Sequence, residues 1–225
     1  MNITLESIDA VRPSTYNPRS AVPERLDLIE LSLRKLGFIA PIFADSDGEI
    51  LSGHQRHLVA SRMGATHVPV FRTKALDLDQ RKALNIVFNR ATNDFDFNST
   101  PGRVTSELQS LDIQALAARI PDKQVGGDGF LRCLKPAEVA VKDLCRVNSG
   151  RWIQYARNLA RTLHRHGILM PIVCREDLSV INGIGRLEML AEKGAVFAPV
   201  VFVTGEEAEF ARAMMNLLSM DFDIH

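Results

Sequence analysis

The stretch of sequence that decides the fold occurs twice in this chain. Residues 37–70 read GFIAPIFADSDGEILSGHQRHLVASRMGATHVPV, and residues 167–200 read GILMPIVCREDLSVINGIGRLEMLAEKGAVFAPV. The two segments align without a gap at an offset of 130 residues, and ten of the 34 columns are identical. Several of the shared residues are glycines or prolines at expected turns. Because a repeat at a fixed offset indicates a duplicated structural unit, we expect two tandem copies of one small α/β unit.

The expected order of elements is the same in both copies. In the first copy, apolar residues recur at steps of three or four between Pro23 and Gly37, which predicts an amphipathic helix that ends at the glycine. Three strands are expected, at residues 39–44, 49–52 and 67–72. Two further helices are expected, at residues 53–63 and 79–90. The second copy begins with an equivalent helix from Ile153 to Leu163, which ends at Gly167.

The repeat also suggests domain boundaries. Residues 1–120 are expected to form the first copy with a helical tail, because residues 99–120 have an amphipathic helical pattern. Residues 121–136 contain several glycines and no periodicity, so we interpret them as a linker. Residues 137–225 are expected to form the second copy.

Composition limits the functional classes. Lys+Arg and Asp+Glu both number 27, so the chain lacks the basic excess of most free-standing DNA-binding modules. No apolar run approaches the roughly 20 residues of a membrane span, and no signal peptide is visible. Cys133, Cys145 and Cys174 form no disulfide or zinc pattern. We therefore expect a cytoplasmic protein with reduced thiols and no membrane partner.

A local basic run lies on the first helix of the second copy. It comprises Arg157, Arg161, His164, Arg165 and His166. Such a run can contact nucleic acid, but a solvated helix face is the interpretation that we favour.

A strand-to-helix junction in the first copy has the residues best suited to ligand binding. It comprises Ser52, Gly53, His54, Gln55 and Arg56. Glycine allows close approach to the backbone, and the first N–H groups of the following helix carry partial positive charge. This arrangement is typical of phosphate sites, and an arginine in the first turn adds a bidentate donor. Alternatively, Arg56 and Arg186, which share a column of the repeat, satisfy backbone carbonyls between helix and sheet.

His54 has several interpretations. It could contact a phosphate or act as a catalytic acid or base, because its pKa lies near neutrality. It could equally be a polar residue at a helix N-terminus without a ligand. A metal shared by His54, His57 and Asp45 or Asp47 would need three or four secured ligands, and the sequence secures none, so we predict no metal site.

Several motifs stand in the order seen in ParB-like domains. They are Tyr16-Asn17-Pro18-Arg19, Gly37-x-x-x-Pro41-Ile42, Asp47-Gly48-Glu49-Ile50-Leu51, Gly53-His54-Gln55-Arg56 and Gly64-x-x-x-x-Pro69-Val70. Over residues 3–132 the chain therefore resembles the N-terminal nucleotide-binding domain of the ParB/sulfiredoxin superfamily. Residues 85–130 are similar to the helical tail of ParB-like domains found in phages, plasmids and beside DNA methyltransferases. Residues 139–225 look like a second, diverged copy.

The resemblance implies a nucleotide site in the first copy. In the family, the arginine of the Asn-Pro-Arg motif and the Gly-x-x-Arg loop contact nucleotide phosphates. The matching positions here are Arg19, Gly53, His54, Gln55 and Arg56, and Ser52 precedes the loop. The implied ligand is a nucleoside triphosphate, CTP or ATP, with Mg²⁺.

The chain departs from the family pattern at defined positions. Ala40 and Met170 stand where ParB proteins usually have glutamine before the first proline, which leaves recognition of CTP open. The family's Gly-Glu-Arg-Arg loop has lost its acidic residue and one arginine. No helix-turn-helix or dimerisation segment follows, which argues against a partition clamp. His54 and Ile184 occupy the place of the sulfiredoxin cysteine, which excludes cysteine-sulfinate repair.

The second copy has a poorer site. It keeps Gly183 and Arg186, but the residues between them are Ile184 and Gly185. We expect the first copy to hold the working site, and the second copy to serve as scaffold, pairing surface or partner-binding face.

Three functional hypotheses result. The first is a nucleotide-binding ParB-like protein in a DNA-linked process, such as phage or plasmid DNA modification or maintenance, with DNA or a DNA-acting protein as partner. The second is phosphoryl transfer or NTP hydrolysis at the same site, with His54 or a carboxylate of the first helix as base. The third is a non-catalytic adaptor. A homodimer is compatible with all three.

Overall fold

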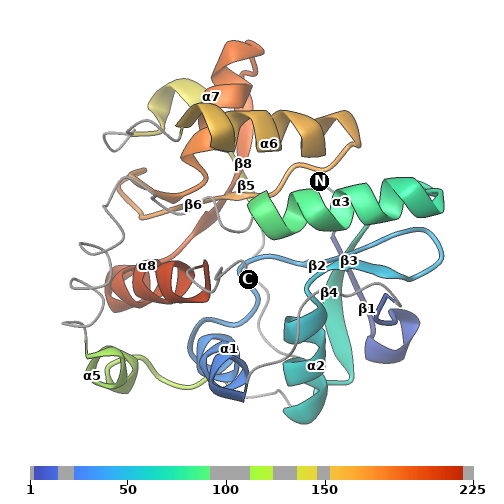
Figure 1. The fold of residues 1–225 in the computed structure, drawn as a ribbon. Helices are drawn as coiled ribbons and strands as arrows, with labels where there is room; N and C mark the ends of the chain where they lie inside the picture. The colour runs from blue at the N-terminus through green and yellow to red at the C-terminus, as the bar shows by residue number, and fades with distance from the viewer. Residues whose placement is uncertain (1–2, 15–22, 92–111, 124–135, 146–152, 220–225) are drawn as a thin grey trace. The chain divides into compact units, whose positions relative to one another are not determined.

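The computed structural model describes residues 3–14, 23–91, 112–123, 136–145 and 153–219. The chain divides into two compact units, each built on one four-stranded sheet (Figure 1). The first unit comprises Met1–Asn89, Asp122–Leu134 and His166–Ile168, and the second comprises Arg90–Pro121, Lys135–Arg165 and Leu169–His225. Among the described helices, none combines the length and apolar character needed to cross a membrane.

The first unit contains four strands and three main helices. The strands are β1 (Thr4–Ser7), β2 (Ile42–Ala44), β3 (Ile50–Ser52) and β4 (His67–Arg72). The helices are α1 (Pro23–Leu36), α2 (His54–Arg62) and α3 (Leu78–Ala91), and a short 3-10 helix, η1 (Ile8–Ala10), follows β1.

The second unit repeats this order and adds one short helix before its first strand. Its strands are β5 (Ala137–Ala140), β6 (Ile172–Cys174), β7 (Val180–Asn182) and β8 (Phe197–Phe202). Its helices are α5 (Ile113–Ala118), α6 (Ile153–Arg165), α7 (Ile184–Glu192) and α8 (Gly205–Ser219), with a 3-10 helix, η2 (Val141–Asp143), after β5.

The two sheets have the same topology. The strand order is β1-β4-β2-β3 in the first unit and β5-β8-β6-β7 in the second, and only the central pair of each sheet is parallel. Ile42 lies opposite Val70, and Ile172 lies opposite Val200. The predicted fold, two small α/β units with sheets flanked by helices, is therefore confirmed.

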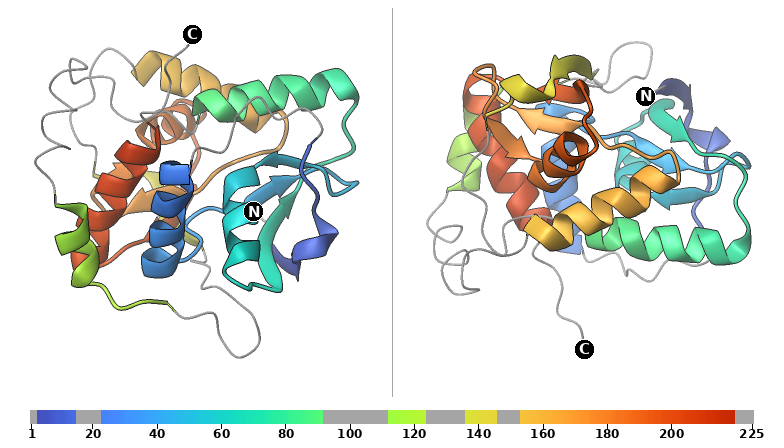
Figure 2. Two further views of the ribbon diagram at one scale, coloured as in Figure 1. Left: turned by 60° about the horizontal axis from the view of Figure 1, so that its bottom comes forward. Right: turned by 90° about the horizontal axis from the view of Figure 1, so that it is seen from above.

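Helices bury both faces of the first sheet. Side chains alternate along a strand, so Ile42 and Phe43 point to opposite faces, and both are fully buried. Ile42 lies beside the N-terminus of α2, while the ring of Phe43 lies 4.8 Å from the ring of Phe88 on α3. Helices α1 and α2 contact each other and lie side by side (Figures 1 and 2). The junction before α2 is thus held between sheet and helix.

Most of the predicted elements are present with adjusted bounds. Helix α1 runs from Pro23 to Leu36 and ends at Gly37, which has a φ of 75°. The strand expected at residues 39–44 is shorter, because Pro41 has no N–H for a sheet ladder. Strands β1 and β5 were not predicted, since their short sequences are mostly exposed and lack an apolar alternation.

The region between the two copies is partly described. Within the predicted helical tail, α5 is capped by Asp112, whose side chain accepts the Ala115 N–H at 2.9 Å, and α5 contacts α8 of the second unit. At the start of the predicted linker, Asp122 forms an ion pair with Lys35 at 2.6 Å. The boundaries drawn from the sequence stay predictions.

Candidate functional site

Gly53 sets the geometry of the strand-to-helix junction in the first unit. It precedes α2 with a φ of 102°, a left-handed conformation that L side chains rarely adopt. A Cβ at this position would lie 3.2 Å from Nη2 of Arg56 and 3.3 Å from the Ile42 side chain. The Gly-x-x-Arg spacing is therefore explained by packing, because the guanidinium lies against the face of the glycine.

Arg56 has a structural role in this packing. Its Nη1 donates to the carbonyl of Ala40 and, at 3.1 Å, to the carbonyl of Pro41. These contacts match the alternative raised from the sequence, in which the arginine satisfies carbonyls between helix and sheet. Contact of Arg56 with a phosphate stays a prediction.

The charge on Arg56 is nevertheless not balanced by a carboxylate among the described residues. Burial lowers the pKa of Arg56 to about 10, so the guanidinium remains protonated at neutral pH. This cation lies in the first turn of α2, where the helix dipole already favours negative charge. Two positive contributions therefore coincide at one helix end, which is the electrostatic arrangement that binds an anion.

Backbone N–H groups add to this arrangement. The N–H of His57 is bonded to the Gly53 carbonyl at 2.8 Å and begins the helical ladder. The N–H groups that precede it in the first turn have no acceptor within the helix.

The two histidines of α2 contact different parts of the backbone. The Nε2 atom of His54 accepts the Ser14 N–H at 3.3 Å, whereas Nε2 of His57 lies 2.9 Å from the Ile8 carbonyl, to which it donates. Asp45 is instead paired with Arg81. Among the described residues, no three histidine, cysteine or carboxylate side chains are grouped as a metal ion would require. A catalytic role for His54 stays a prediction.

Gln55 is held by a residue that the sequence analysis did not single out. Its Oε1 accepts a hydrogen bond from Nε of Arg25 at 2.9 Å, so the first turns of α1 and α2 are joined. The Nε2 atom of Gln55 is buried and has no acceptor in the described part of the chain. A sequence signal for Arg25 existed, because it stands in register with Ile29 and Leu33 on the apolar stripe of α1.

Two further predicted positions remain to be placed. Ser52 ends β3 opposite Phe43 and leads directly into Gly53. Arg19 lies outside the described residues, so its predicted phosphate contact is a sequence-based expectation alone.

In the second unit the glycine and the arginine pack in the same way, but the polar side chains between them are absent. Gly183 has a φ of 102°, and a Cβ there would lie 2.8 Å from Nη2 of Arg186. Arg186 is buried and donates to the carbonyl of Pro171 and to Oδ1 of Asn182. With Ile184 and Gly185 in place of the first unit's histidine and glutamine, the Gly-x-x-Arg feature persists here as architecture.

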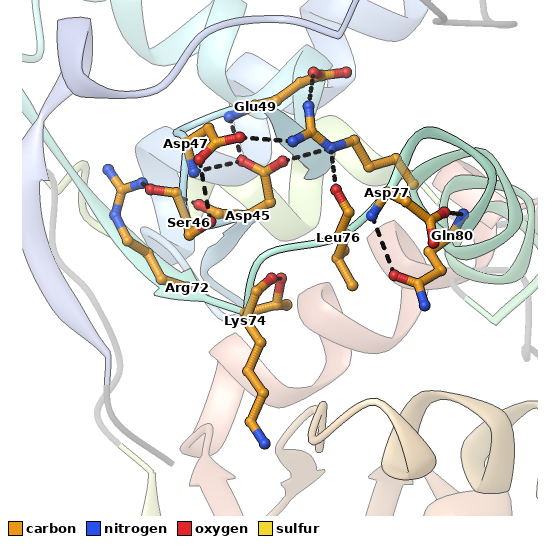
Figure 3. A network of polar contacts seen from close by, with 11 residues as sticks. Asp45, Ser46, Asp47, Glu49, Arg72, Lys74, Leu76, Asp77 and Gln80 are labelled. Carbon is orange, nitrogen blue, oxygen red and sulfur yellow. Dashed lines mark hydrogen bonds and ion pairs between the residues drawn. The ribbon is translucent and has the colours of Figure 1, made fainter.

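A second polar cluster lies at the β2–β3 turn of the first unit (Figure 3). Arg81 of α3 lies between three carboxylates: Nε is 2.8 Å from Asp45, and the terminal nitrogens are each 2.7 Å from Asp47 or Glu49. Asp45 is fully buried, and its Oδ1 accepts the N–H groups of both other acidic residues at 2.9 Å. The cluster anchors α3 to the turn, because every charge in it has a partner.

The basic run of the second copy is partly neutralised. Arg157 lies 3.4 Å from Glu192 of α7, and Arg161 also forms an ion pair with that carboxylate. These contacts agree with the solvated-face interpretation rather than with an open basic patch.

The two described cysteines have different environments. Cys174 is buried in β6, and burial raises the pKa of its thiol to about 12, whereas Cys145 is exposed. The high pKa makes Cys174 a poor nucleophile at neutral pH. Cys133 lies outside the described residues.

Known proteins with similarity to this chain include one with a ParB-like domain. No protein-family model matches it. The ParB-like nuclease domain-containing protein YnaK of Escherichia coli (strain K12) is 26% identical over 82 residues, which cover 36% of this chain and 94% of that protein. Over these residues the chain is similar to a ParB-like domain.

Solved structures with similarity to this chain include two ParB proteins. One is the C-terminally truncated chromosome-partitioning protein ParB from Caulobacter crescentus complexed with CTP-γ-S. It is 19% identical in sequence, and the match covers 53% of this chain and 86% of that chain with a TM-score of 0.37. The other is a Pnob8-like ParB-N domain, with 20% identity, coverage of 43% and 50%, and a TM-score of 0.30.

Proposed function

We propose that this protein binds a nucleotide at the Gly53 junction and acts in a DNA-linked process. The observation that carries the proposal is a combination that the second unit lacks: the protonated guanidinium of Arg56 lies at the N-terminus of α2 without a carboxylate partner among the described residues, and the polar residues His54 and Gln55 precede it in the same turn. An anion with several oxygens, such as a phosphate chain, would neutralise this charge and accept from the first-turn N–H groups.

The DNA-linked part of the proposal rests on the relative. YnaK is named for a ParB-like nuclease domain, and it is matched over nearly its whole length. The balanced charge of this chain supports an indirect link to DNA, through a partner or a nucleotide-dependent state, over strong non-specific binding. Phage or plasmid DNA modification or maintenance is the setting that we propose.

The junction does not provide a metal site of its own. Mg²⁺ prefers oxygen ligands, chiefly carboxylates and phosphates. The predicted side chains at the junction are a serine, a histidine, a glutamine and arginines, and no carboxylate is among them. A Mg²⁺ ion that accompanies a triphosphate would therefore be held through the phosphate oxygens.

The test is a calorimetric titration of CTP, ATP, GTP and ADP, each with Mg²⁺, into the wild type and two matched variants. Arg56→Gln keeps a donor for the carbonyls of residues 40 and 41 but removes the charge, and Arg186→Gln is the same change in the second unit. We expect binding by the wild type, a loss of at least about tenfold in Arg56→Gln, and little change in Arg186→Gln.

The titration also separates the alternatives. If no nucleotide binds, the phosphate site is wrong and a non-catalytic adaptor becomes the better account. If a nucleotide binds, incubation followed by product analysis tests phosphoryl transfer or hydrolysis. A base role for His54 would then predict that His54→Gln retains binding and loses turnover, because glutamine can replace the hydrogen bond to Ser14 but cannot accept a proton.

A further inference from the structure

Arg25 is a buried cation on the inner face of α1. Its side chain is only 9% exposed, and its neighbours on the same helix face are Leu26, Ile29 and Leu33. A charged residue on an apolar stripe loses hydration and needs a specific partner. The partner on α2 is Gln55, which Arg25 contacts through Nε at 2.9 Å.

The contact fixes the orientation of the Gln55 amide. The Nε–H of arginine can only donate, so the atom that faces it must be the carbonyl oxygen of the amide. The amide nitrogen, Nε2, is buried, and no described residue offers it an acceptor.

An unpaired buried donor is uncommon, because leaving one unsatisfied is unfavourable. Gln55 is the second residue of α2, so it lies in the same turn as Arg56 and the N–H groups that have no acceptor within the helix. An oxygen of an anion bound at this turn would supply the missing acceptor.

We propose that Arg25 is a positioning residue of the anion site: it holds the Gln55 amide so that Nε2 donates to a phosphate oxygen of the ligand. The inference rests on the proposed function and extends it across two helices. The amide of Gln55 is neutral and can donate to a ligand only when it is oriented, and Arg25 supplies that orientation.

A double-mutant cycle tests this role, with inorganic pyrophosphate and CTP, each with Mg²⁺, as probes. Its variants are Arg25→Lys, Gln55→Met and the double variant. Lysine keeps the positive charge but lacks the Nε donor, so any loss reports orientation rather than charge. We expect Arg25→Lys to weaken binding by about fivefold when Gln55 is present, the value of one hydrogen bond, and to have almost no effect in the Gln55→Met background.

Each outcome is informative. Equal losses in both backgrounds would overturn the positioning role, because Arg25 would then act on the ligand directly or through its charge. No loss in either background would also overturn it, although the nucleotide site would stand. If the wild type binds neither probe, both this inference and the proposed function fail.

A measurement without ligand checks the contact itself. Gln55→Glu keeps an acceptor for Arg25 and adds an opposite charge, so the Tm of the protein should stay the same or rise. A lower Tm would show that Arg25 and Gln55 are not partners, and would overturn the inference whatever the binding results.

Discussion

Three turn residues with positive φ show where the backbone needs glycine and where it tolerates a side chain. Gly48 and Gly64 have similar φ values, 86° and 81°. A Cβ at Gly48 would lie 2.5 Å from the carbonyl oxygen of Ala10, whereas a Cβ at Gly64 would meet nothing within 4 Å. In the second unit, Leu178 occupies the position of Gly48 with a φ of 66°, so the same turn there tolerates a side chain.

This contrast gives a matched pair of substitutions. Both glycine-to-alanine changes place a side chain in the left-handed region, but only Gly48→Ala also meets backbone. We expect the free energy of unfolding to fall by about 3 kcal/mol for Gly48→Ala and by about 1 kcal/mol for Gly64→Ala. Urea unfolding of the two variants measures the difference, and equal losses would show that the turn can shift to relieve the contact.

A second prediction at the residue scale concerns pH. Arg72 of β4 donates to both carboxylate oxygens of Glu6 on β1, with Nη2 to Oε2 at 2.6 Å, and these hydrogen bonds hold the pKa of Glu6 below its ordinary value. A carboxyl whose pKa is lower in the folded state stabilises the fold above its unfolded pKa. That stabilisation is lost as the pH falls through the folded pKa.

We therefore expect Glu6→Gln to lower stability at pH 7 by about 1 kcal/mol, since both side chains are partly exposed. The difference from the wild type should shrink as the pH is lowered below about 4, where the wild-type carboxyl becomes protonated. Urea unfolding at a series of pH values measures it. A difference that persists unchanged at low pH would mean that Glu6 acts through packing.

At the scale of elements, the residue that follows the first strand of the central parallel pair forms an ion pair with the last helix of its unit. The two units use opposite charges at that residue. In the first unit Asp45 pairs with Arg81 of α3, and in the second Arg175 pairs with Glu209 of α8. Asp45 is fully buried, while the second pair is exposed. The same connection is therefore a buried anchor in one unit and a surface contact in the other.

Breaking the ion pair should have unequal effects in the two units. Arg81→Met leaves a buried carboxylate without its ion pair, so we expect a loss of about 3 kcal/mol in the free energy of unfolding. Glu209→Gln breaks an exposed pair and should cost less than about 1 kcal/mol. Denaturant unfolding of both variants tests the contrast. A small loss for Arg81→Met would show that Asp45 finds another partner at little cost.

The elements were predictable to the extent that local pattern determines them. The spacing of apolar residues and the turn glycines predicted α1, α2, β4 and α3, because amphipathic periodicity and left-handed glycines act locally. The edge strands β1 and β5 could not be predicted, since their pairing depends on a partner more than 50 residues away in the sequence. The contact of Arg25 with Gln55 was missed for the same reason: nothing local connects two helices 30 residues apart.

At the scale of the whole molecule, the two units share one fold but differ in the polarity of the side chains at the start of α2 and of α7. In both units the arginine of the Gly-x-x-Arg motif packs against the glycine. This packing is therefore a feature of the fold and does not by itself indicate a bound ligand. Ligand binding is expected only where polar side chains accompany that packing. His54, Gln55 and Arg25 provide them in the first unit, and the second unit has Ile184 and Gly185 instead.

We expect the first unit to bind phosphate groups at the start of α2 and the second unit not to bind them at the start of α7. NMR titration of the labelled full chain with CTP and Mg²⁺ tests it most directly. The backbone amide signals of His54, Gln55 and Arg56 should shift, and those of Ile184, Gly185 and Arg186 should stay unmoved. Equal shifts at both junctions, or shifts at neither, would contradict it.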